Sequence, residues 1–258
     1  KISEHPDVRL PVISNQDGFM TSHTAQNVIP LEDKVACDFV GPYLQVNALL
    51  NFDKPVTHGV QTEQDWHFEH KAKQHAALMG SKKVILETFA QFKELTGREY
   101  KLVESYNLEN ADIAIVCLGT TFETAMIAIN QLKAEGINAA VVAPRVFRPF
   151  PLEEVAEALQ NVKAIACMDR SAPGGTVGAL YNEVSGALFN TPARPLMSNL
   201  IYGLGGRDMT VAILKDIFRT LDKEAKAGKL SGKIQRFIGV RGPELSFYDV
   251  QGDVKWVS

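Results

Sequence analysis

The sequence has few of the residues from which metal clusters and disulfide frameworks are built. Only three of its 258 residues are cysteines, Cys37, Cys117 and Cys167, and they lie far apart. That spacing excludes a four-cysteine iron–sulfur motif within this chain and argues against a disulfide framework. Because two of the three lie in apolar, strand-like stretches, a reducing cytoplasm suits this set best.

The chain also lacks an excess of charge of either sign and a long apolar run. It carries 27 basic and 30 acidic residues, which gives a formal net charge of −3. No basic field or tail indicates a nucleic acid or a membrane surface as a partner. No apolar run reaches the ~18 residues of a membrane span, and no signal peptide is visible.

The familiar catalytic motifs are missing as well. There is no Walker loop, no Gly-x-Gly-x-x-Gly fingerprint, no Gly-x-Ser-x-Gly elbow and no His-Glu-x-x-His pair. All six histidines lie in the first 75 residues, and the three within 67–75 fall on a predicted helix with a solvated or subunit-facing surface. His23, flanked by Ser22 and Thr24, either orders a turn or reaches a site made with another chain. We therefore expect no complete catalytic set and no metal site on this chain.

After about residue 110, apolar strand-like stretches alternate with helical patterns. The strands are expected within 112–121, 138–147, 163–171 and 195–203, and the helices over 123–135, 151–160, 177–189 and 209–226. Four such repeats predict an α/β fold with an open, mainly parallel sheet and helices on both faces. Residues 229–258 contain glycines that break any period, so we expect an irregular C-terminal tail.

The first hundred residues are less regular. An apolar stretch at 10–13 suggests a buried strand that leads into a turn, and residues 22–43 are expected to form an extended connector. The spacing of apolar residues predicts a helix over 65–95, with Asp65 as its N-cap and Gly97 as its stop. We expect a domain boundary near residue 60. The chain opens at Lys1 inside an element, so we expect it to be part of a longer polypeptide.

The stretch NLIYGLGGRDMT, residues 199–210, joins the last predicted strand to the last helix. In open parallel sheets ligands gather at the carboxyl ends of the strands, and two glycines there can cradle a phosphate. Gly205 and Gly206 have the wrong spacing for a dinucleotide fingerprint, so a sharp turn with positive φ is favoured. Asp208 is expected to cap the helix that follows. Arg207 is left as solvated, paired across a subunit contact or bound to a ligand.

Five stretches, in this order, carry a resemblance to a known family. They are LPVISNQDGFMTSHT, GREYKLVESYNLENADIAIVCLGT, PRVFRPFPLEEVAEAL, KAIACMDRS and IYGLGGRDMT. Over roughly residues 1–225 the chain resembles the α subunit of 2-oxoacid:ferredoxin oxidoreductases, the pyruvate synthase type and its oxalate-oxidising relative. RVFRPFP and GLGGRD at this separation are the most specific of the shared motifs.

The resemblance implies a domain organisation. Residues 1–60 would be the C-terminal part of the pyrimidine-binding domain of a thiamine diphosphate enzyme, and 61–100 a connecting helix. Residues 101–228 would form a transketolase C-terminal-like α/β domain, and 229–258 a C-terminal tail.

The resemblance also implies an activity and its cofactors. A small 2-oxoacid such as pyruvate, or oxalate, would be oxidatively decarboxylated, with coenzyme A as an optional acceptor. Thiamine diphosphate and Mg²⁺ would be shared with or held by a β subunit. The 4Fe–4S clusters that pass electrons to ferredoxin would lie on partner subunits.

Two groups of site candidates follow from the same resemblance. The match at DGFMTSHT implies a cofactor interface at Asp17, Gly18, Ser22 and His23. Docking of neighbouring subunits is expected at Arg145, Arg148, Gly205, Gly206, Arg207 and Asp208. The chain would then supply one wall of the cofactor cleft and an assembly domain. Two other classes stay open: a component of another thiamine diphosphate enzyme, transketolase-like or a 2-oxoacid dehydrogenase, and a non-catalytic docking subunit.

Overall fold

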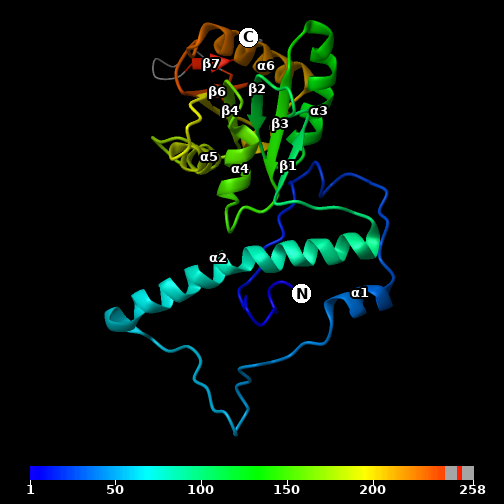
Figure 1. Ribbon diagram of the computed structural model, residues 1–258, viewed down its shortest axis with the longest axis vertical. Helices are drawn as coiled ribbons and strands as arrows, with labels where there is room; N and C mark the ends of the chain where they lie inside the picture. The colour runs from blue at the N-terminus through cyan, green and yellow to red at the C-terminus, as the bar shows by residue number, and fades with distance from the viewer. Residues whose placement is uncertain (242–248, 252–258) are drawn as a thin grey trace. The chain divides into compact units, whose positions relative to one another are not determined.

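The computed structural model describes residues 1–241 and 249–251, which fall into two compact units (Figure 1). The first unit contains Lys1–Asn15 and Ala25–Lys101. The second contains Gln16–Thr24 together with the described residues from Leu102 onward. A short segment from the N-terminal part of the chain therefore belongs to the C-terminal unit.

The first unit is built on two helices, α1 (Asp33–Val40) and α2 (Glu63–Thr96). Gly97 ends α2 in the left-handed conformation, at φ 71°, and its N–H donates to the Lys93 carbonyl, as glycine at a helix C-terminus commonly does. The prediction that Asp65 caps this helix is wrong, because Thr62 occupies the N-cap position. Asp65 lies instead in the first turn, where its charge favours the helix dipole.

Two further expectations for this unit are wrong. No strand forms at 10–13, where Val12 and Ile13 are 58% and 79% exposed. A strand needs a neighbour to take its backbone hydrogen bonds, and in the described part of the chain nothing pairs with this segment. The connector expected at 22–43 contains helix α1.

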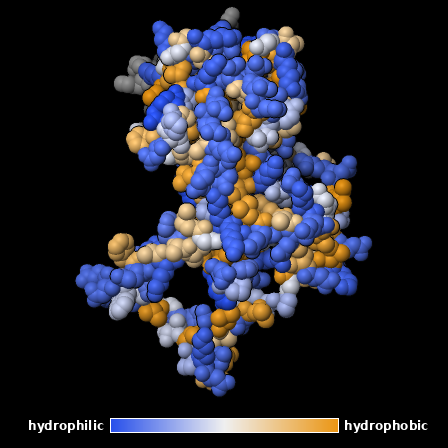
Figure 2. All heavy atoms as spheres, viewed as in Figure 1, coloured by the Kyte–Doolittle hydropathy of each residue, from blue (hydrophilic) through white to orange (hydrophobic). Residues whose placement is uncertain are grey.

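Figure 2 shows apolar patches over the surface that α1, α2 and their connecting segments form.

The second unit is an α/β domain with a seven-stranded sheet in the order β1-β3-β2-β4-β5-β6-β7 (Figure 1). The strands are β1 (Val103–Tyr106), β2 (Ile113–Val116), β3 (Ala139–Pro144), β4 (Ala164–Asp169), β5 (Leu196–Ile201), β6 (Gln235–Ile238) and β7 (Asp249–Gln251). Only β1 runs antiparallel to its neighbour β3. The remaining neighbours are parallel, so the predicted open, mainly parallel sheet is confirmed.

Helices cover both faces of this sheet. They are α3 (Thr121–Leu132), α4 (Leu152–Leu159), α5 (Ala179–Phe189) and α6 (Val211–Ala227). Alternate residues of β2 point to opposite faces: Ile113 and Ile115 pack in the core under α3 and α6, and Ala114 and Val116 in the core under α4 and α5. Because both faces are covered, the central strands are apolar on both sides.

The prediction of an irregular tail over 229–258 is wrong for the described strands at 235–238 and 249–251, and residues 242–248 and 252–258 lie outside the described residues. Residues 235–238 form β6, which pairs in parallel with β5. The side chain of Arg236 in β6 is only 3% exposed and pairs with Glu224 of α6. A charged side chain can be buried in a sheet when a buried partner of opposite charge pairs with it. Here that partner lies on another element, α6.

The start of α6 corrects the expected role of Asp208 and gives a stability prediction. Thr210 is the N-cap, and its side-chain oxygen accepts from the Ile213 N–H at 3.3 Å. We expect Thr210→Ala to lower the free energy of unfolding by about 1 kcal/mol. Asp208→Ala should change it by less than ~0.5 kcal/mol. Urea unfolding of both variants checks this, and a larger loss for Asp208→Ala would contradict the observed cap.

Candidate functional site

The sheet reverses its strand order between β2 and β4. From β2 the chain moves to β3 on one side, crosses back to β4 on the other, and continues outward to β5 and β6. In open α/β sheets the crevice at the carboxyl ends of two such strands is where ligands bind. The candidate site is therefore the loop after β2, residues 117–121, together with the loop that begins at Arg170 after β4.

A carboxylate from elsewhere in the same unit lies in this crevice. Asp17 Oδ2 accepts a hydrogen bond from the Thr120 N–H at 2.6 Å, at the N-terminus of α3. Arg170 Nη1 lies 3.6 Å from Asp17 Oδ1. Gly119, at φ 66°, packs so closely that a Cβ there would come within 2.5 Å of both Asp17 carboxylate oxygens. Asp17 thus takes the position that a bound anion would occupy at a helix N-terminus.

Tyr202, which directly follows β5, packs against the side chains that surround Asp17. The Arg170 guanidinium lies over the Tyr202 ring, 5.2 Å from its centre, and the Tyr202 hydroxyl is 2.8 Å from that of Thr121. Gly203, at φ 66°, leaves room for Arg170, because a Cβ there would lie 3.2 Å from Nε. The loops after β2, β4 and β5 therefore meet at one cluster.

The environment of Asp17 keeps it ionised. Partial burial raises the pKa of its carboxyl, but the hydrogen bonds from the Thr120 backbone and side chain and the charge of Arg170 outweigh that effect, so the pKa lies below its usual value. A carboxyl with a depressed folded-state pKa stabilises the fold above its unfolded pKa and loses that contribution as the pH falls through the folded one. The Asp17 contact is therefore at full strength at neutral pH.

The loop that Asp17 begins is ordered by its own side chains. The Phe19 N–H donates to Ser22 Oγ at 2.9 Å, and that oxygen lies 2.7 Å from His23 Nδ1. The rings of Phe19 and His23 stack with their centres 4.5 Å apart. Phe19 has φ 62° and is 71% exposed. His23 therefore takes part in the order of the turn, and a role at a cofactor interface stays a prediction for the loop residues, Gly18 among them.

The arginines predicted as docking residues form ion pairs within the chain. Arg145 Nε lies 3.0 Å from a Glu104 carboxylate oxygen, and Arg148 Nη2 lies 2.5 Å from Glu183 Oε1. Their side chains are 45% and 50% exposed. At that exposure such pairs contribute only ~0–1 kcal/mol to stability. Because both side chains are about half exposed, another subunit can still reach them.

The stretch GLGGRD is a turn. Gly203 to Gly206 pass through a 3-10 turn in which Gly205 and Gly206 have φ 68° and 81°, as expected for a sharp bend. Arg207 Nη1 donates to the Gly239 carbonyl just beyond β6. Of the three roles considered for Arg207, none included this intrachain contact. A docking role for Arg207 and Asp208 stays a prediction.

Thr120, Arg170 and Tyr202 were not among the predicted site residues. Each lies near the end of a stretch expected to contain a strand, within 112–121, 163–171 or 195–203, which was the available signal. Asp17 was predicted as a cofactor-interface residue. What the sequence could not supply was its contact with Thr120 and Arg170, which joins these loops. The histidines at 67, 70 and 75 are exposed on α2.

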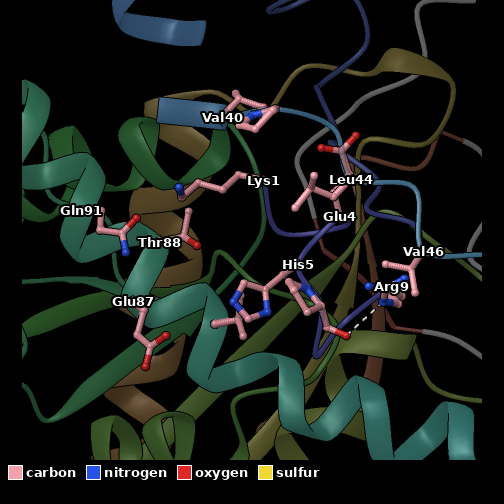
Figure 3. Close-up of a pocket in the computed structure, with 13 residues that line it drawn as sticks. Lys1, Glu4, His5, Arg9, Val40, Leu44, Val46, Glu87, Thr88 and Gln91 are labelled. Atoms are coloured by element: carbon pink, nitrogen blue, oxygen red, sulfur yellow. Dashed lines mark hydrogen bonds between the residues drawn. The ribbon is translucent and has the colours of Figure 1, made fainter. Parts of the chain in front are cut away.

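The first unit contains a cavity of about 290 Å³. Figure 3 shows Glu87, Thr88 and Gln91 of α2 along one side of it and residues of the N-terminal segment along the other. The lining mixes charges of both signs, with Lys1 and Arg9 beside Glu4 and Glu87. Such a mixture selects no particular ligand charge.

Family models match both parts of the chain. A pyruvate flavodoxin/ferredoxin oxidoreductase, thiamine diphosphate-binding model matches residues 1–90. A pyruvate:ferredoxin oxidoreductase core domain II model matches residues 111–214. The chain belongs to the pyruvate:ferredoxin oxidoreductase family. The resemblance to α subunits of 2-oxoacid:ferredoxin oxidoreductases is thereby confirmed.

Curated relatives in this family have related names. The chain is 37% identical over 241 residues to pyruvate synthase subunit PorA of Thermotoga maritima, covering 93% of this chain and 60% of that one. It is 38% identical over 227 residues to PorA of Methanocaldococcus jannaschii, covering 86% and 57%. It is 34% identical over 229 residues to ketoisovalerate oxidoreductase subunit VorA of Pyrococcus horikoshii, covering 88% and 58%. The chain thus spans about 60% of the length of these relatives.

The side chains of the described residues can be compared with what the Mg²⁺ ion of thiamine diphosphate requires. A Mg²⁺ ion that bridges a diphosphate needs carboxylate or carbonyl oxygens around it. Across residues 1–241 and 249–251, no three His, Cys, Asp or Glu side chains are grouped to hold a metal ion. Asp17 is already bound to Thr120 and Arg170. The described residues therefore offer no cluster of these four side-chain types for the metal.

In the described part of the chain, no helix combines the length and apolar character needed to cross a bilayer.

Proposed function

We propose that this chain is part of the α subunit of a thiamine diphosphate-dependent 2-oxoacid:ferredoxin oxidoreductase. The enzyme oxidatively decarboxylates a small 2-oxoacid, with pyruvate the first candidate and oxalate the alternative. It passes the electrons through iron–sulfur clusters on partner subunits to ferredoxin. Thiamine diphosphate, held with Mg²⁺, would supply the electron sink for the decarboxylation. The enzyme works in the cytoplasm.

The observation that carries this proposal is the order of the two family matches. A thiamine diphosphate-binding model over 1–90 is followed by core domain II over 111–214, and relatives at 34–38% identity are named as pyruvate synthase or ketoisovalerate oxidoreductase subunits. The three cysteines, two of them buried, support a division of labour in which other subunits hold the clusters. Burial raises the pKa of the Cys117 thiol to about 12, which suits a packing residue better than a cluster ligand.

Within that enzyme this chain provides surfaces. The organisation proposed is the end of a pyrimidine-binding domain at 1–60, a connecting helix at 61–100, a transketolase C-terminal-like domain at 101–228 and the segment 229–258. The loop 18–24 forms part of a cofactor-facing wall, and the exposed arginines Arg145 and Arg148 dock the β and iron–sulfur subunits. Coenzyme A is the acyl acceptor where the substrate is a 2-oxoacid with a carbon chain.

His23 gives this proposal a residue-level test. In the complex of the full-length subunit with its partners, His23→Ala should lower 2-oxoacid turnover or the affinity for thiamine diphosphate by about tenfold or more, because its exposed ring stacks on Phe19 at the surface of the loop. His75→Ala, on the solvated face of α2, is the matched control. Kinetics equal to wild type, with the complex intact, would leave His23 with turn ordering alone.

The substrate class is tested with the assembled complex and a panel of acids. Ferredoxin reduction is followed with pyruvate, 2-oxoisovalerate, 2-oxoglutarate and oxalate, each with and without coenzyme A. Reduction by one of the 2-oxoacids supports the proposal, and reduction by oxalate without coenzyme A selects the alternative. Decarboxylation without any ferredoxin reduction would place the chain in another class of thiamine diphosphate enzyme. Assembly with partners but no turnover of any acid would leave a docking subunit.

A further inference from the structure

We propose that Asp17 is an internal carboxylate ligand of the crevice between β2 and β4, and that it positions the loop 18–24 by filling that crevice. The crevice in which such folds bind a ligand thus holds a segment of this same chain, the one that follows Asp17. We treat Asp17 as a positioning residue, because its contacts are to Thr120 and Arg170. Its effect on turnover, which rests on the proposed function, would pass through the loop.

The crevice has the features of an anion site, and Asp17 meets each of them. The N-terminus of α3, a helix of 12 residues, presents the Thr120 N–H, and Arg170 from the β4 loop supplies a positive charge on the other oxygen. A charged acceptor that receives a backbone N–H and faces a guanidinium forms stronger hydrogen bonds than a neutral one. The pairing joins residues that are 103 positions apart in the sequence.

The Asp17 carboxylate fills the space beside Gly119. The backbone at Gly119 lies against the carboxylate, so closely that even a Cβ would overlap it. The Asp17 side chain is only 18% exposed. A carboxylate tethered to the same chain acts at an effective concentration on the order of millimolar or higher, which puts a free phosphate or nucleotide at a disadvantage.

The segment that follows Asp17 is the one whose placement this contact determines. Residues 18–24 have their own hydrogen bonds, from Phe19 to Ser22 and from Thr24 to Met20, but these act within the loop. Gln16–Thr24 nevertheless belongs to the α/β unit. The Asp17 carboxylate supplies a charged attachment to the β2 and β4 loops, and the Phe19–His23 stack is carried with it.

The attachment is tested in the full-length chain by hydrogen exchange, which does not depend on turnover. Asp17→Ala should speed amide exchange of residues 18–24 and of Thr120 by roughly tenfold to a hundredfold, as expected for loss of a charged hydrogen bond. Asp112→Ala, which removes the exposed partner of Lys163 at 2.5 Å, is the matched control and should leave this exchange unchanged. Wild-type exchange of 18–24 and Thr120 in Asp17→Ala would overturn the proposal.

Chemical rescue separates a ligand role from a general structural one. The Ala variant leaves the Thr120 N–H and the Arg170 guanidinium without their carboxylate, so acetate or formate should bind there and restore the protection of Thr120. Chloride at the same ionic strength serves as the salt control. Rescue by chloride equal to that by acetate, or no rescue by either carboxylate, would contradict a specific carboxylate site.

The link to catalysis rests on the proposed function and has its own readout. In the assembled complex, Asp17→Ala should lower kcat for the 2-oxoacid, with KM changed less, and acetate should restore part of kcat. Altered exchange with unchanged kcat would refute positioning of the active centre while leaving the proposed function intact. A wild-type complex that turns over no 2-oxoacid would refute the proposed function, and the exchange experiment would still decide the attachment.

Discussion

Glu224→Ala is expected to destabilise the α/β unit by about 3–5 kcal/mol, because it leaves a buried charge unpaired. Glu224 Oε1 lies 3.0 Å from Arg236 Nη2, and the two side chains are 1% and 3% exposed. The same oxygen accepts from the Ser231 N–H at 2.9 Å. Loss of the carboxylate therefore leaves the Arg236 guanidinium and the Ser231 N–H without this partner. Urea unfolding monitored by circular dichroism measures the change.

Two controls separate charge burial from loss of packing. The double variant Glu224→Met with Arg236→Met removes both charges, so its stability should lie far closer to wild type than that of Glu224→Ala. Glu135→Ala removes a carboxylate that pairs with Arg219 at 2.7 Å, but on side chains 35% and 39% exposed, and should cost only ~0–1 kcal/mol. A cost for Glu224→Ala no larger than that for Glu135→Ala would contradict the burial of this pair.

Gly178→Ala should lower stability by an amount near the upper end of ~1–3 kcal/mol, because the added methyl group overlaps the Asp169 carboxyl. That carboxyl closes the N-terminus of α5, accepting from the Leu180 N–H at 2.8 Å and from the Tyr181 N–H at 3.2 Å. Gly178 itself donates its N–H to Asn199 Oδ1 at 2.9 Å. The overlap therefore disturbs the join between β4, β5 and α5.

A glycine inside α5 should respond to the same substitution with the opposite sign. Gly186 of α5 is exposed, and a Cβ there would meet nothing within 4 Å. Gly186→Ala should raise stability by about 0.5–1 kcal/mol, because alanine loses less backbone entropy in a helix. Thermal unfolding of the two variants side by side gives the comparison. Equal effects of the same sign would show that the crowding at Gly178 is relieved by movement of Asp169.

The central sheet could be predicted because its signal is local. β2 to β5 are apolar stretches that alternate with helical patterns, so their existence and their mainly parallel direction could be predicted from the sequence. β1 and β6 have no such signal: β1 reads VESY and β6 reads QRFI. The burial of Arg236 in β6 depends on its partner Glu224 on α6. No pattern within the four residues QRFI indicates that burial.

The candidate site was predictable only in part for a related reason. The carboxyl ends of the strands follow from the alternation of strands and helices, and the glycine turn at 203–206 follows from its composition. The Asp17 contact joins Thr120 to a residue 103 positions away, and neither residue alone has an unusual sequence context. Asp208 was assigned the cap because it precedes the apolar period. The helix begins two residues later than that pattern suggests, after Thr210.

The proposed role of this chain is tested most directly by carbon dioxide release from pyruvate labelled at C1. The assembled complex is assayed with and without the full-length subunit, and label release is measured together with ferredoxin reduction. We expect both only when this subunit and thiamine diphosphate are present, with ferredoxin reduced in proportion to the label released, or the same coupling for another 2-oxoacid labelled at C1. A complex that reduces ferredoxin and releases the label at the same rate without this subunit would contradict that role.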